Sequence, residues 1–110
     1  MVGVPRRGEV WLVNLDPTQG AEIRKTRPCL IVAPNEINET LETTIVAPMT
    51  TAIRSYPTRV SVLFQGKRGQ VAIDQIRAVD RRRLVRKLGT VSPAAAEHVF
   101  AVLVEMFTRA

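Results

Sequence analysis

Two short segments of the chain place an arginine and a threonine beside prolines at the ends of apolar runs. Residues 25–34 and 43–50 both have the length and apolar content of buried strands. If the runs are antiparallel neighbours in the register whose partner numbers sum to 77, Arg27 faces Thr50. A fixed guanidinium beside a hydroxyl can bind a phosphate group and neutralise charge that grows on it in a transition state. We therefore predict a phosphate-handling site at Arg27 and Thr50.

Further polar residues stand where a loop and a later strand are expected. Residues 16–27 form a long charged loop, and loops of this length inside a small domain are usually functional. Residues 70–79 read as a strand in which Gln75 and Arg77 share a face, while Asp74 points the other way unless a bulge intervenes. Asp74 is either a structural acceptor for backbone or arginine groups or a member of the site.

Histidine, cysteine and aromatic residues are scarce. The single histidine, His98, falls in a helical pattern, and the single cysteine, Cys29, lies in an apolar run. These counts exclude a paired-histidine mechanism within one chain and a zinc site of the usual nitrogen and sulfur ligands. Aromatic residues make up only 5%, so any base-stacking surface must come from Trp11, Tyr56 or Phe64.

The amino-acid composition is typical of a folded protein, and its charge favours polyanionic partners. The 110 residues are enough for one domain, residues 1–110, and the 45% hydrophobic and 24% charged fractions are ordinary for a globular chain. The net charge of +6 favours nucleic acid as a partner. No apolar run is long enough to span a bilayer, and the first residues do not resemble a signal peptide, so we expect a cytoplasmic protein.

The remaining pattern predicts strands first and helices last. Residues 8–15 read as a strand with Trp11 and Val13 on one face and Val10 and Leu12 on the other, and residues 58–64 read as a strand with one polar face. Residues 81–88 read as a short helix capped by Asp80, whose basic side chains form a solvated face or, alternatively, contact nucleic acid. A second helix is expected to about Thr108, with Ser92 as N-cap, and its apolar stripe is wide enough to suggest a dimer. This order favours a small, bent, mostly antiparallel sheet or barrel packed by helices.

An ordered set of short motifs resembles the MazF/PemK (Kid) family of toxin endoribonucleases, over nearly the whole chain from about residue 6. No single motif is decisive, but the set in this order is specific. The motifs are Arg7-Gly8-Glu9-Val10-Trp11, Leu15-Asp16-Pro17, Gly20-Ala21-Glu22, Arg27-Pro28, Ile45-Val46-Ala47-Pro48-Met49-Thr50 and Asp74-Gln75-Ile76-Arg77.

The resemblance implies a fold, an activity and partners. It implies an SH3-like barrel of the CcdB/MazF type with a C-terminal helix, a homodimer, and sequence-specific cleavage of single-stranded RNA without a metal or other cofactor. It also implies a MazE-like antitoxin whose acidic segment blocks the RNA groove. The matching catalytic residues are Arg27 and Thr50. The substrate-binding candidates are Glu22, Lys25, Asp74, Gln75 and Arg77.

Two departures from the family pattern bear on the site. Many relatives have a serine where this chain has Ala21, and relatives that pair the aspartate with an arginine two positions earlier have that arginine where this chain has Ala72. Of the two residue schemes in the family, the scheme of Arg27 with Thr50 therefore fits better. In such cleavage the ribose 2′-hydroxyl attacks the phosphate and leaves a 2′,3′-cyclic phosphate and a 5′-hydroxyl. Arginine stays protonated, so Arg27 stabilises charge and the general base stays open.

Two other functions are compatible with the composition and fold class. A CcdB-type gyrase poison has the same fold, but those relatives act through a tryptophan close to the C-terminus, whereas this chain has only Trp11. A non-catalytic SH3-like nucleic-acid-binding module needs no Arg27 and Thr50 pair.

Overall fold

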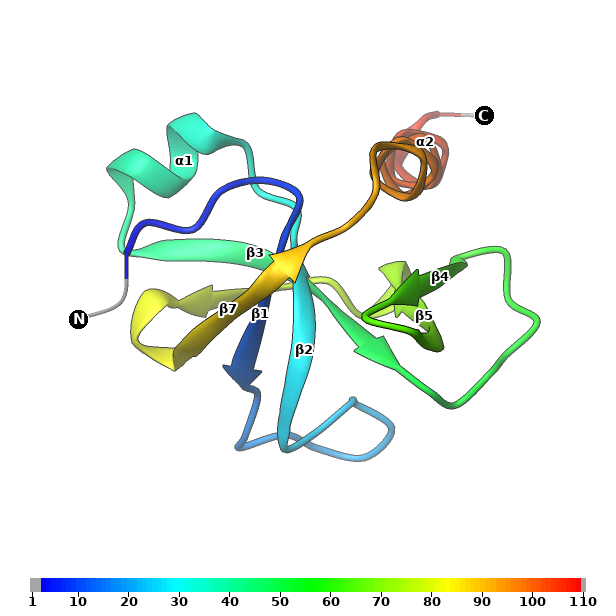
Figure 1. Ribbon diagram of the computed structural model, residues 1–110, viewed down its shortest axis with the longest axis horizontal. Coiled ribbons are helices and arrows are strands. Elements are labelled where there is room, and N and C mark those ends of the chain that lie inside the picture. Colours follow the sequence, from blue (N-terminus) through cyan, green and yellow to red (C-terminus); the bar gives the residue numbers. More distant parts are fainter. Residues whose placement is uncertain (1–2, 110) are drawn as a thin grey trace.

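A strongly curved, seven-stranded sheet and one long helix form most of the structure (Figure 1). The structure is a computed structural model that describes residues 3–109. The strand order is β4-β5-β3-β2-β1-β7, and β6 also pairs with β3. The elements in chain order are β1 (Glu9–Asn14), β2 (Thr26–Ile31), α1 (Asn35–Thr40), β3 (Thr43–Thr50), β4 (Arg59–Phe64), β5 (Lys67–Ala72), the 3₁₀ turn η1 (Ile73–Gln75), β6 (Arg77–Asp80), the 3₁₀ turn η2 (Arg81–Arg83), β7 (Leu84–Thr90) and α2 (Pro93–Phe107).

The register predicted between β2 and β3 is confirmed. Cys29, Leu30 and Ile31 lie opposite Pro48, Ala47 and Val46, so the partner numbers sum to 77. An antiparallel partner needs only a short connection, and the match of two apolar runs fixes which residues face each other. The connection holds the helix α1, which the sequence analysis did not predict.

Strand β3 is the centre of the sheet because both of its edges are paired. Strand β2 covers one edge, while β6 and then β5 cover the other. Partner numbers sum to 123 along β6 and to 120 along β5, so η1 inserts three extra residues between them. The single strand expected at residues 70–79 is therefore wrong: it is two strands separated by a turn. The inserted residues leave the sheet because the ladder has no partners for them.

Alternating side chains divide the interior into two clusters on opposite faces of the central strands. Leu30 and Val10 belong to the cluster that α2 covers, where Val99 is fully buried. Trp11, Cys29 and their neighbours fill the other cluster. Trp11 and Val10 thus point to opposite faces of β1, as the alternation predicts.

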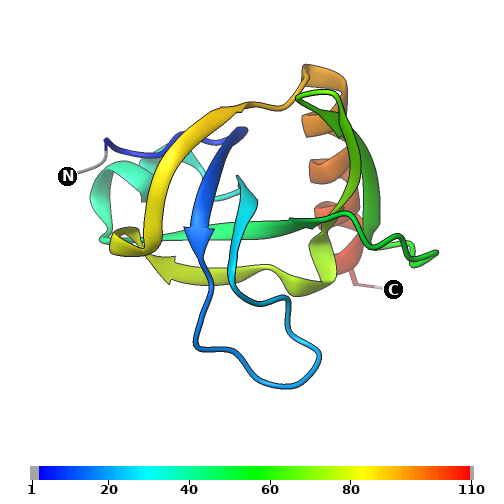
Figure 2. The same ribbon diagram turned by 60° about the horizontal axis from the view of Figure 1, so that its bottom comes forward.

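The C-terminal helix follows its predicted caps. The Ser92 hydroxyl accepts a hydrogen bond from the Ala95 N–H at 3.2 Å, and Pro93 is the first helical residue. In Figure 2 the helix lies along β4 and β5. Its last turns are open, because Val104 and Phe107 are each 68% exposed. No helix within residues 3–109 is long and apolar enough to cross a membrane.

The helix expected at residues 81–88 is wrong. Asp80 does accept a hydrogen bond from the Arg82 N–H, but it caps only η2, and β7 follows and pairs with β1. Leu84 and Leu88 are four residues apart, and an even separation also places two side chains on one face of a strand. Gly89 does not end a helix; a Cβ there would lie 3.1 Å from Cζ of Phe64, which packs against it.

The three consecutive arginines of η2 bind different partners. Arg81 donates to the Asn38 and Leu41 carbonyl oxygens, and Arg83 donates to those of Asn14 and Asp16. Arg82 forms an ion pair with Asp80. Arg81 and Arg83 therefore fasten neighbouring chain segments, and the run is not a helix face; its contact with nucleic acid stays a prediction.

Candidate functional site

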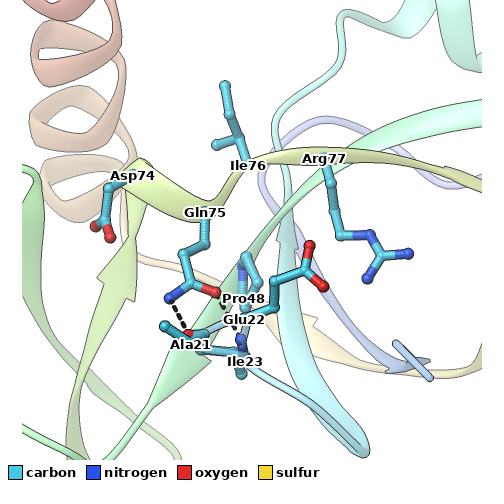
Figure 3. Close-up of a pocket in the computed structure, with 8 residues that line it drawn as sticks. All are labelled: Ala21, Glu22, Ile23, Pro48, Asp74, Gln75, Ile76 and Arg77. Atoms are coloured by element: carbon cyan, nitrogen blue, oxygen red, sulfur yellow. Dashed lines mark hydrogen bonds between the residues drawn. The ribbon is translucent and has the colours of Figure 1, made fainter. Parts of the chain in front are cut away.

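A hollow of about 470 Å³ opens between the loop of residues 15–25, the end of β3 and the η1–β6 segment (Figure 3). The interrupted ladder explains its position, since η1 projects the residues that form one wall. Four of the seven predicted site residues lie in this wall and in the facing loop. The lining residues are Ala21, Glu22, Ile23, Pro48, Asp74, Gln75, Ile76 and Arg77.

Gln75 binds the tip of loop 15–25. Its Oε1 accepts from the Ile23 N–H at 2.6 Å and its Nε2 donates to the Ala21 carbonyl at 3.3 Å, as Figure 3 shows. A side-chain amide can accept from a backbone N–H and donate to a backbone C=O, as the backbone of a neighbouring strand would. The predicted substrate-binding amide therefore holds the loop in this structure.

Arg77 and Lys25 lie at the base of the same loop. Nη1 of Arg77 donates to the Leu15 carbonyl at 3.0 Å. The Lys25 carbonyl accepts from the Leu15 N–H at 2.9 Å, and the Lys25 N–H donates to Asp16 at 3.1 Å. The backbone of Lys25 thus closes the neck of the loop, while its side chain is exposed.

Glu22 lies at the tip, on the wall of the hollow opposite η1. Its carboxylate accepts from the Gln19 N–H at 2.6 Å, within a tight turn of the loop. The neighbouring Arg24 is exposed on the same loop. The hollow is therefore lined by the carboxylates of Glu22 and Asp74 and by Arg77, and the loop that forms one wall also carries exposed cationic side chains.

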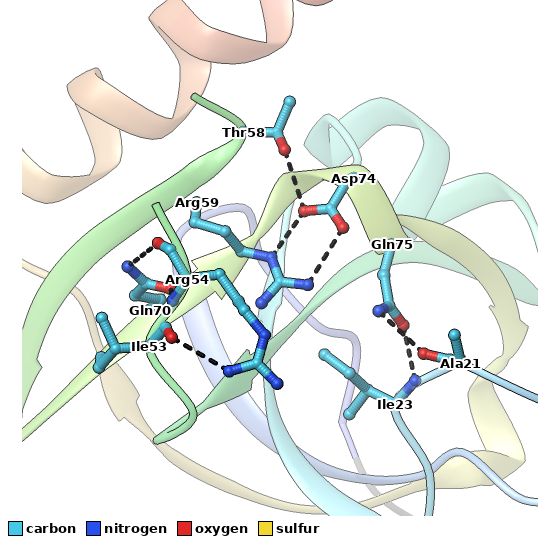
Figure 4. Close-up of polar contacts among 9 residues, drawn as sticks. All are labelled: Ala21, Ile23, Ile53, Arg54, Thr58, Arg59, Gln70, Asp74 and Gln75. Atoms are coloured by element: carbon cyan, nitrogen blue, oxygen red, sulfur yellow. Dashed lines mark hydrogen bonds and ion pairs between the residues drawn. The ribbon is translucent and has the colours of Figure 1, made fainter. Parts of the chain in front are cut away.

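Asp74 is paired with an arginine that the sequence analysis missed. Arg59 donates Nε and Nη2 to the two carboxylate oxygens at 2.8 and 3.2 Å, and the Thr58 hydroxyl donates at 3.1 Å (Figure 4). The Arg59 side chain is only 8% exposed. These hydrogen bonds, those from Arg59 foremost, hold the pKa of Asp74 below its usual value. Asp74 is thus an acceptor for an arginine, and because it also lines the hollow, its membership of the site stays a prediction.

The register of the β4–β5 hairpin explains this pair. Arg59 lies directly opposite Ala72, the position that lacks the arginine of some relatives, so the neighbouring strand supplies the cation. Gln65 and Gly66 both have positive φ, which is typical of a two-residue hairpin turn. Counting outward from that turn would have placed Arg59 beside Ala72 from the sequence.

A second glutamine holds the loop of residues 51–58. Oε1 of Gln70 accepts from the Arg54 N–H at 3.0 Å, and its Nε2 donates to the Arg54 carbonyl at 2.9 Å (Figure 4). Gln70 is only 4% exposed. The guanidinium of Arg54 extends away from this anchor and is exposed. Nothing in the local sequence pattern predicted this role for Gln70.

Arg27 and Thr50 lie at the ends of their strands, next to these loops. The β2–β3 ladder ends at Cys29 and Pro48, and Thr50 pairs instead with Gln70 of β5. The Thr50 hydroxyl accepts from the Ala52 N–H at 3.1 Å, and Nε of Arg27 donates to the Arg24 carbonyl at 3.1 Å. Their direct juxtaposition stays a prediction, because the strands stop pairing two residues before it.

The side chains of His98 and Cys29 do not line the hollow. His98 is exposed on α2, and Cys29 is buried, which raises the pKa of its thiol to about 12. Within residues 3–109, no three His, Cys, Asp or Glu side chains are grouped so that they could hold a metal ion. The hollow is lined by one ion-paired carboxylate, Asp74, one loop carboxylate, Glu22, and one arginine, Arg77.

The chain belongs to the family of PemK-like, MazF-like toxins of type II toxin–antitoxin systems, which it matches over residues 6–107. It is 42% identical to the endoribonuclease PemK of Escherichia coli over 81 residues, which are 69% of this chain and 61% of that relative's length. The resemblance inferred from the motifs is thereby confirmed.

Solved structures confirm the fold. The crystal structure of MazF from Deinococcus radiodurans is 26% identical, with a TM-score of 0.84 over 96% of this chain and 97% of the other. A mycobacterial endoribonuclease in complex with its cognate antitoxin is also 26% identical, with a TM-score of 0.80 over 96% and 99% of the two chains. The prediction of a mostly β, MazF-like barrel with a C-terminal helix is correct.

Proposed function

We propose that this protein, as an endoribonuclease toxin of its family, cleaves single-stranded RNA at specific sequences without a metal ion. The observation that carries the proposal is the hollow between loop 15–25, the end of β3 and the η1–β6 segment, with Arg27 and Thr50 at the strand ends next to loops 15–25 and 51–58. The net charge of +6 and the exposed Arg24 and Lys25 of loop 15–25 favour the approach of a polyanion to this face.

The proposed reaction is an internal transfer of the phosphate. The ribose 2′-oxygen forms a bond to phosphorus, the bond from phosphorus to the 5′-oxygen breaks, and the products are a 2′,3′-cyclic phosphate and a 5′-hydroxyl. The 2′-hydroxyl proton passes to a base and the leaving 5′-oxygen takes up a proton. No external nucleophile or cofactor is needed for this balance.

Each candidate side chain has a role that suits its chemistry. Arg27 neutralises the charge that grows on the phosphate, and the Thr50 hydroxyl binds a non-bridging oxygen. Asp74 is occupied by Arg59, so Glu22 is the hollow's better candidate for the proton acceptor. Substrate contacts come from the exposed side chain of Lys25 and from the hollow's polar wall, to which Gln75 and Arg77 belong together with Asp74.

The proposed partners follow from charge and exposed apolar surface. A relative is solved with its cognate antitoxin, and the net positive charge and exposed loop cations of this chain fit an acidic antitoxin segment that competes with RNA. Val104 and Phe107 leave apolar surface open on α2, which a second copy of the chain would cover in a homodimer. We place this activity in the cytoplasm, where its RNA substrate and antitoxin occur.

The test is cleavage of a long single-stranded RNA in the presence of a chelator, followed by mapping of both new ends. We expect cuts at one short recurring sequence with cyclic phosphate ends, and Arg27→Ala should lower the rate about 10²- to 10³-fold. Arg68→Ala, which removes an exposed arginine from the β4–β5 hairpin, is the matched control and should cleave normally.

Other results point to the alternatives. RNA binding without any cut would indicate a non-catalytic module, and a DNA effect that requires gyrase would indicate a gyrase poison. The structure offers little for the poison, because Trp11 is only 5% exposed and donates its Nε1–H to Glu9 at 3.0 Å. Full activity of a folded Arg27→Ala variant would remove the proposed site.

A further inference from the structure

One aromatic side chain on loop 51–58 stands open beside the site. Tyr56 is 50% exposed, and the guanidinium carbon of Arg59 lies 5.2 Å from the centre of its ring. The Tyr56 carbonyl also accepts from the Arg59 N–H at 3.0 Å. A cation over one face at this distance is attracted to the ring, which leaves the opposite face for a ligand.

The cation behind the ring is itself immobilised. Both carboxylate oxygens of Asp74 accept from the Arg59 guanidinium, so its plane is fixed by two parallel bonds (Figure 4). Asp74 also lines the hollow. Tyr56 is thus connected through one buried side chain to the wall of the proposed active site.

The loop is held on both sides of Tyr56. Gln70 holds the backbone of Arg54 on one side, and the Thr58 hydroxyl bonds to Asp74 on the other. Neither anchor uses the ring of Tyr56. A rigid aromatic surface loses little conformational entropy when a ligand stacks on it.

The other aromatic residues are in different situations. Trp11 is 5% exposed, Phe64 packs against Gly89, and Phe100 lies under the Arg7 guanidinium at 3.9 Å. Phe107 is exposed, but on the last turn of α2. Within residues 3–109, Tyr56 is therefore the aromatic side chain that is exposed and is also linked, through Arg59 and Asp74, to the wall of the hollow.

We propose that Tyr56 binds a nucleobase of single-stranded RNA by stacking, and that Arg59, paired with Asp74, positions the ring. The inference rests on the proposed function, because it supplies that RNA site with a base-binding subsite. A stacked base beside the hollow fixes which nucleotide precedes or follows the scissile phosphate. Tyr56 thus contributes to sequence specificity, and Arg59 acts through it.

The test measures RNA affinity separately from cleavage. The probe is a fluorescein-labelled 2′-O-methyl oligonucleotide that carries the mapped cut sequence and has no free 2′-hydroxyl, together with versions in which one base at a time is removed. Tyr56→Leu keeps an apolar side chain but no stacking face, and we expect its affinity to fall on the order of tenfold. Tyr56→Phe should bind like the wild type.

The abasic probes identify the base that stacks. At one position, base removal should weaken binding to the wild type on the order of tenfold but leave binding to Tyr56→Leu unchanged. Arg59→Lys keeps the charge but not the two-bond geometry, so it should show a smaller loss of affinity at the same position. Leu41→Ala, which alters a side chain that is 47% exposed beyond α1, is the control and should bind normally.

The outcomes separate this subsite from the proposed function. If the wild type cleaves RNA but Tyr56→Leu binds every probe as the wild type does, the subsite is refuted and the nuclease stands. Equal losses for Tyr56→Leu at every abasic position would also refute it, because they indicate a general change of the loop. Thermal melting of each variant shows whether the fold is retained.

Discussion

Loop 15–25 forms one wall of the hollow, and loop 51–58 continues from the end of β3. Each loop is held by one glutamine, in a different environment. Gln70 is 4% exposed and bonds to the N–H and C=O of a single residue, Arg54. Gln75 is half-buried, lines the hollow, and bonds to Ile23 and Ala21 at the tip of loop 15–25. The same side chain therefore makes a buried anchor in one loop and a contact at the rim of the site in the other.

The different burial of the two glutamines indicates which loop can change its conformation when a ligand binds. Breaking the Gln70 contacts leaves polar groups unpaired in a partly buried place, which is costly. The Gln75 contacts face the hollow, where water or substrate can replace them. We therefore expect loop 51–58 to be fixed and loop 15–25 to be the adjustable wall of the hollow.

The largest effect on stability is expected at the buried anchor. Gln70→Leu should lower the free energy of unfolding by about 2 kcal/mol, because the Arg54 N–H and C=O lose their partners. Urea unfolding measures the change, with Gln19→Leu as a control for an exposed glutamine. A loss no larger than that of the control would show that the two glutamines do not differ as the comparison requires.

An intermediate effect is expected at the second anchor of loop 51–58, and it depends on pH. The bonds from Arg59 lower the pKa of Asp74 in the folded state, so this contribution is complete above the ordinary aspartate pKa of about 4 and is lost as the pH falls through the lower folded value. Asp74→Asn should cost about 1 kcal/mol at pH 7, since the carboxylate is 31% exposed.

The measurement is urea unfolding of both proteins from pH 7 to pH 2. The stability difference between wild type and Asp74→Asn should shrink below about pH 4, as the carboxylate becomes protonated in both states of the wild type. A difference that stays constant to pH 2 would mean that the ion pair with Arg59 does not stabilise the folded state.

The smallest effect on stability is expected at the rim. Gln75→Leu should cost less than about 1 kcal/mol, because the groups that it frees lie at a surface that water reaches. Hydrogen exchange at the Ile23 amide should nevertheless become faster, since its acceptor at 2.6 Å is lost. Unchanged exchange at Ile23 would show that Gln75 does not hold loop 15–25.

Some parts of the fold were predictable because they depend on neighbours in the chain. The β2–β3 register follows from two apolar runs and a short connection, and the start of α2 follows from Ser92 and Pro93. The same local reasoning failed at β7. Leu84 and Leu88 suit a helix and a strand equally, and pairing with β1 decided between them.

The candidate site was predictable as a set of residues but not as a set of contacts. Glu22, Asp74, Gln75 and Arg77 do line one hollow. Their partners come from distant parts of the chain: Gln75 bonds to Ile23, and Arg77 bonds to Leu15. A sequence pattern does not reveal which side chain satisfies which backbone group, because that depends on how the curved sheet brings loops together.

The sequence by itself determined the family, a net positive charge that favours polyanions, and the chain segments that form most of the strands. It also placed Arg27 and Thr50 at the ends of two strands. These properties depend on composition, on motifs and on spacing along the chain. Only the tertiary structure decided that η1 interrupts the ladder along β3, and that Arg59 supplies the cation for Asp74. The turn of the β4–β5 hairpin indicates that Arg59 lies beside Ala72, but only the fold of η1 brings Asp74 to it. The interruption of the ladder depends on which strands pair, which burial of the two core faces selects and local sequence does not encode.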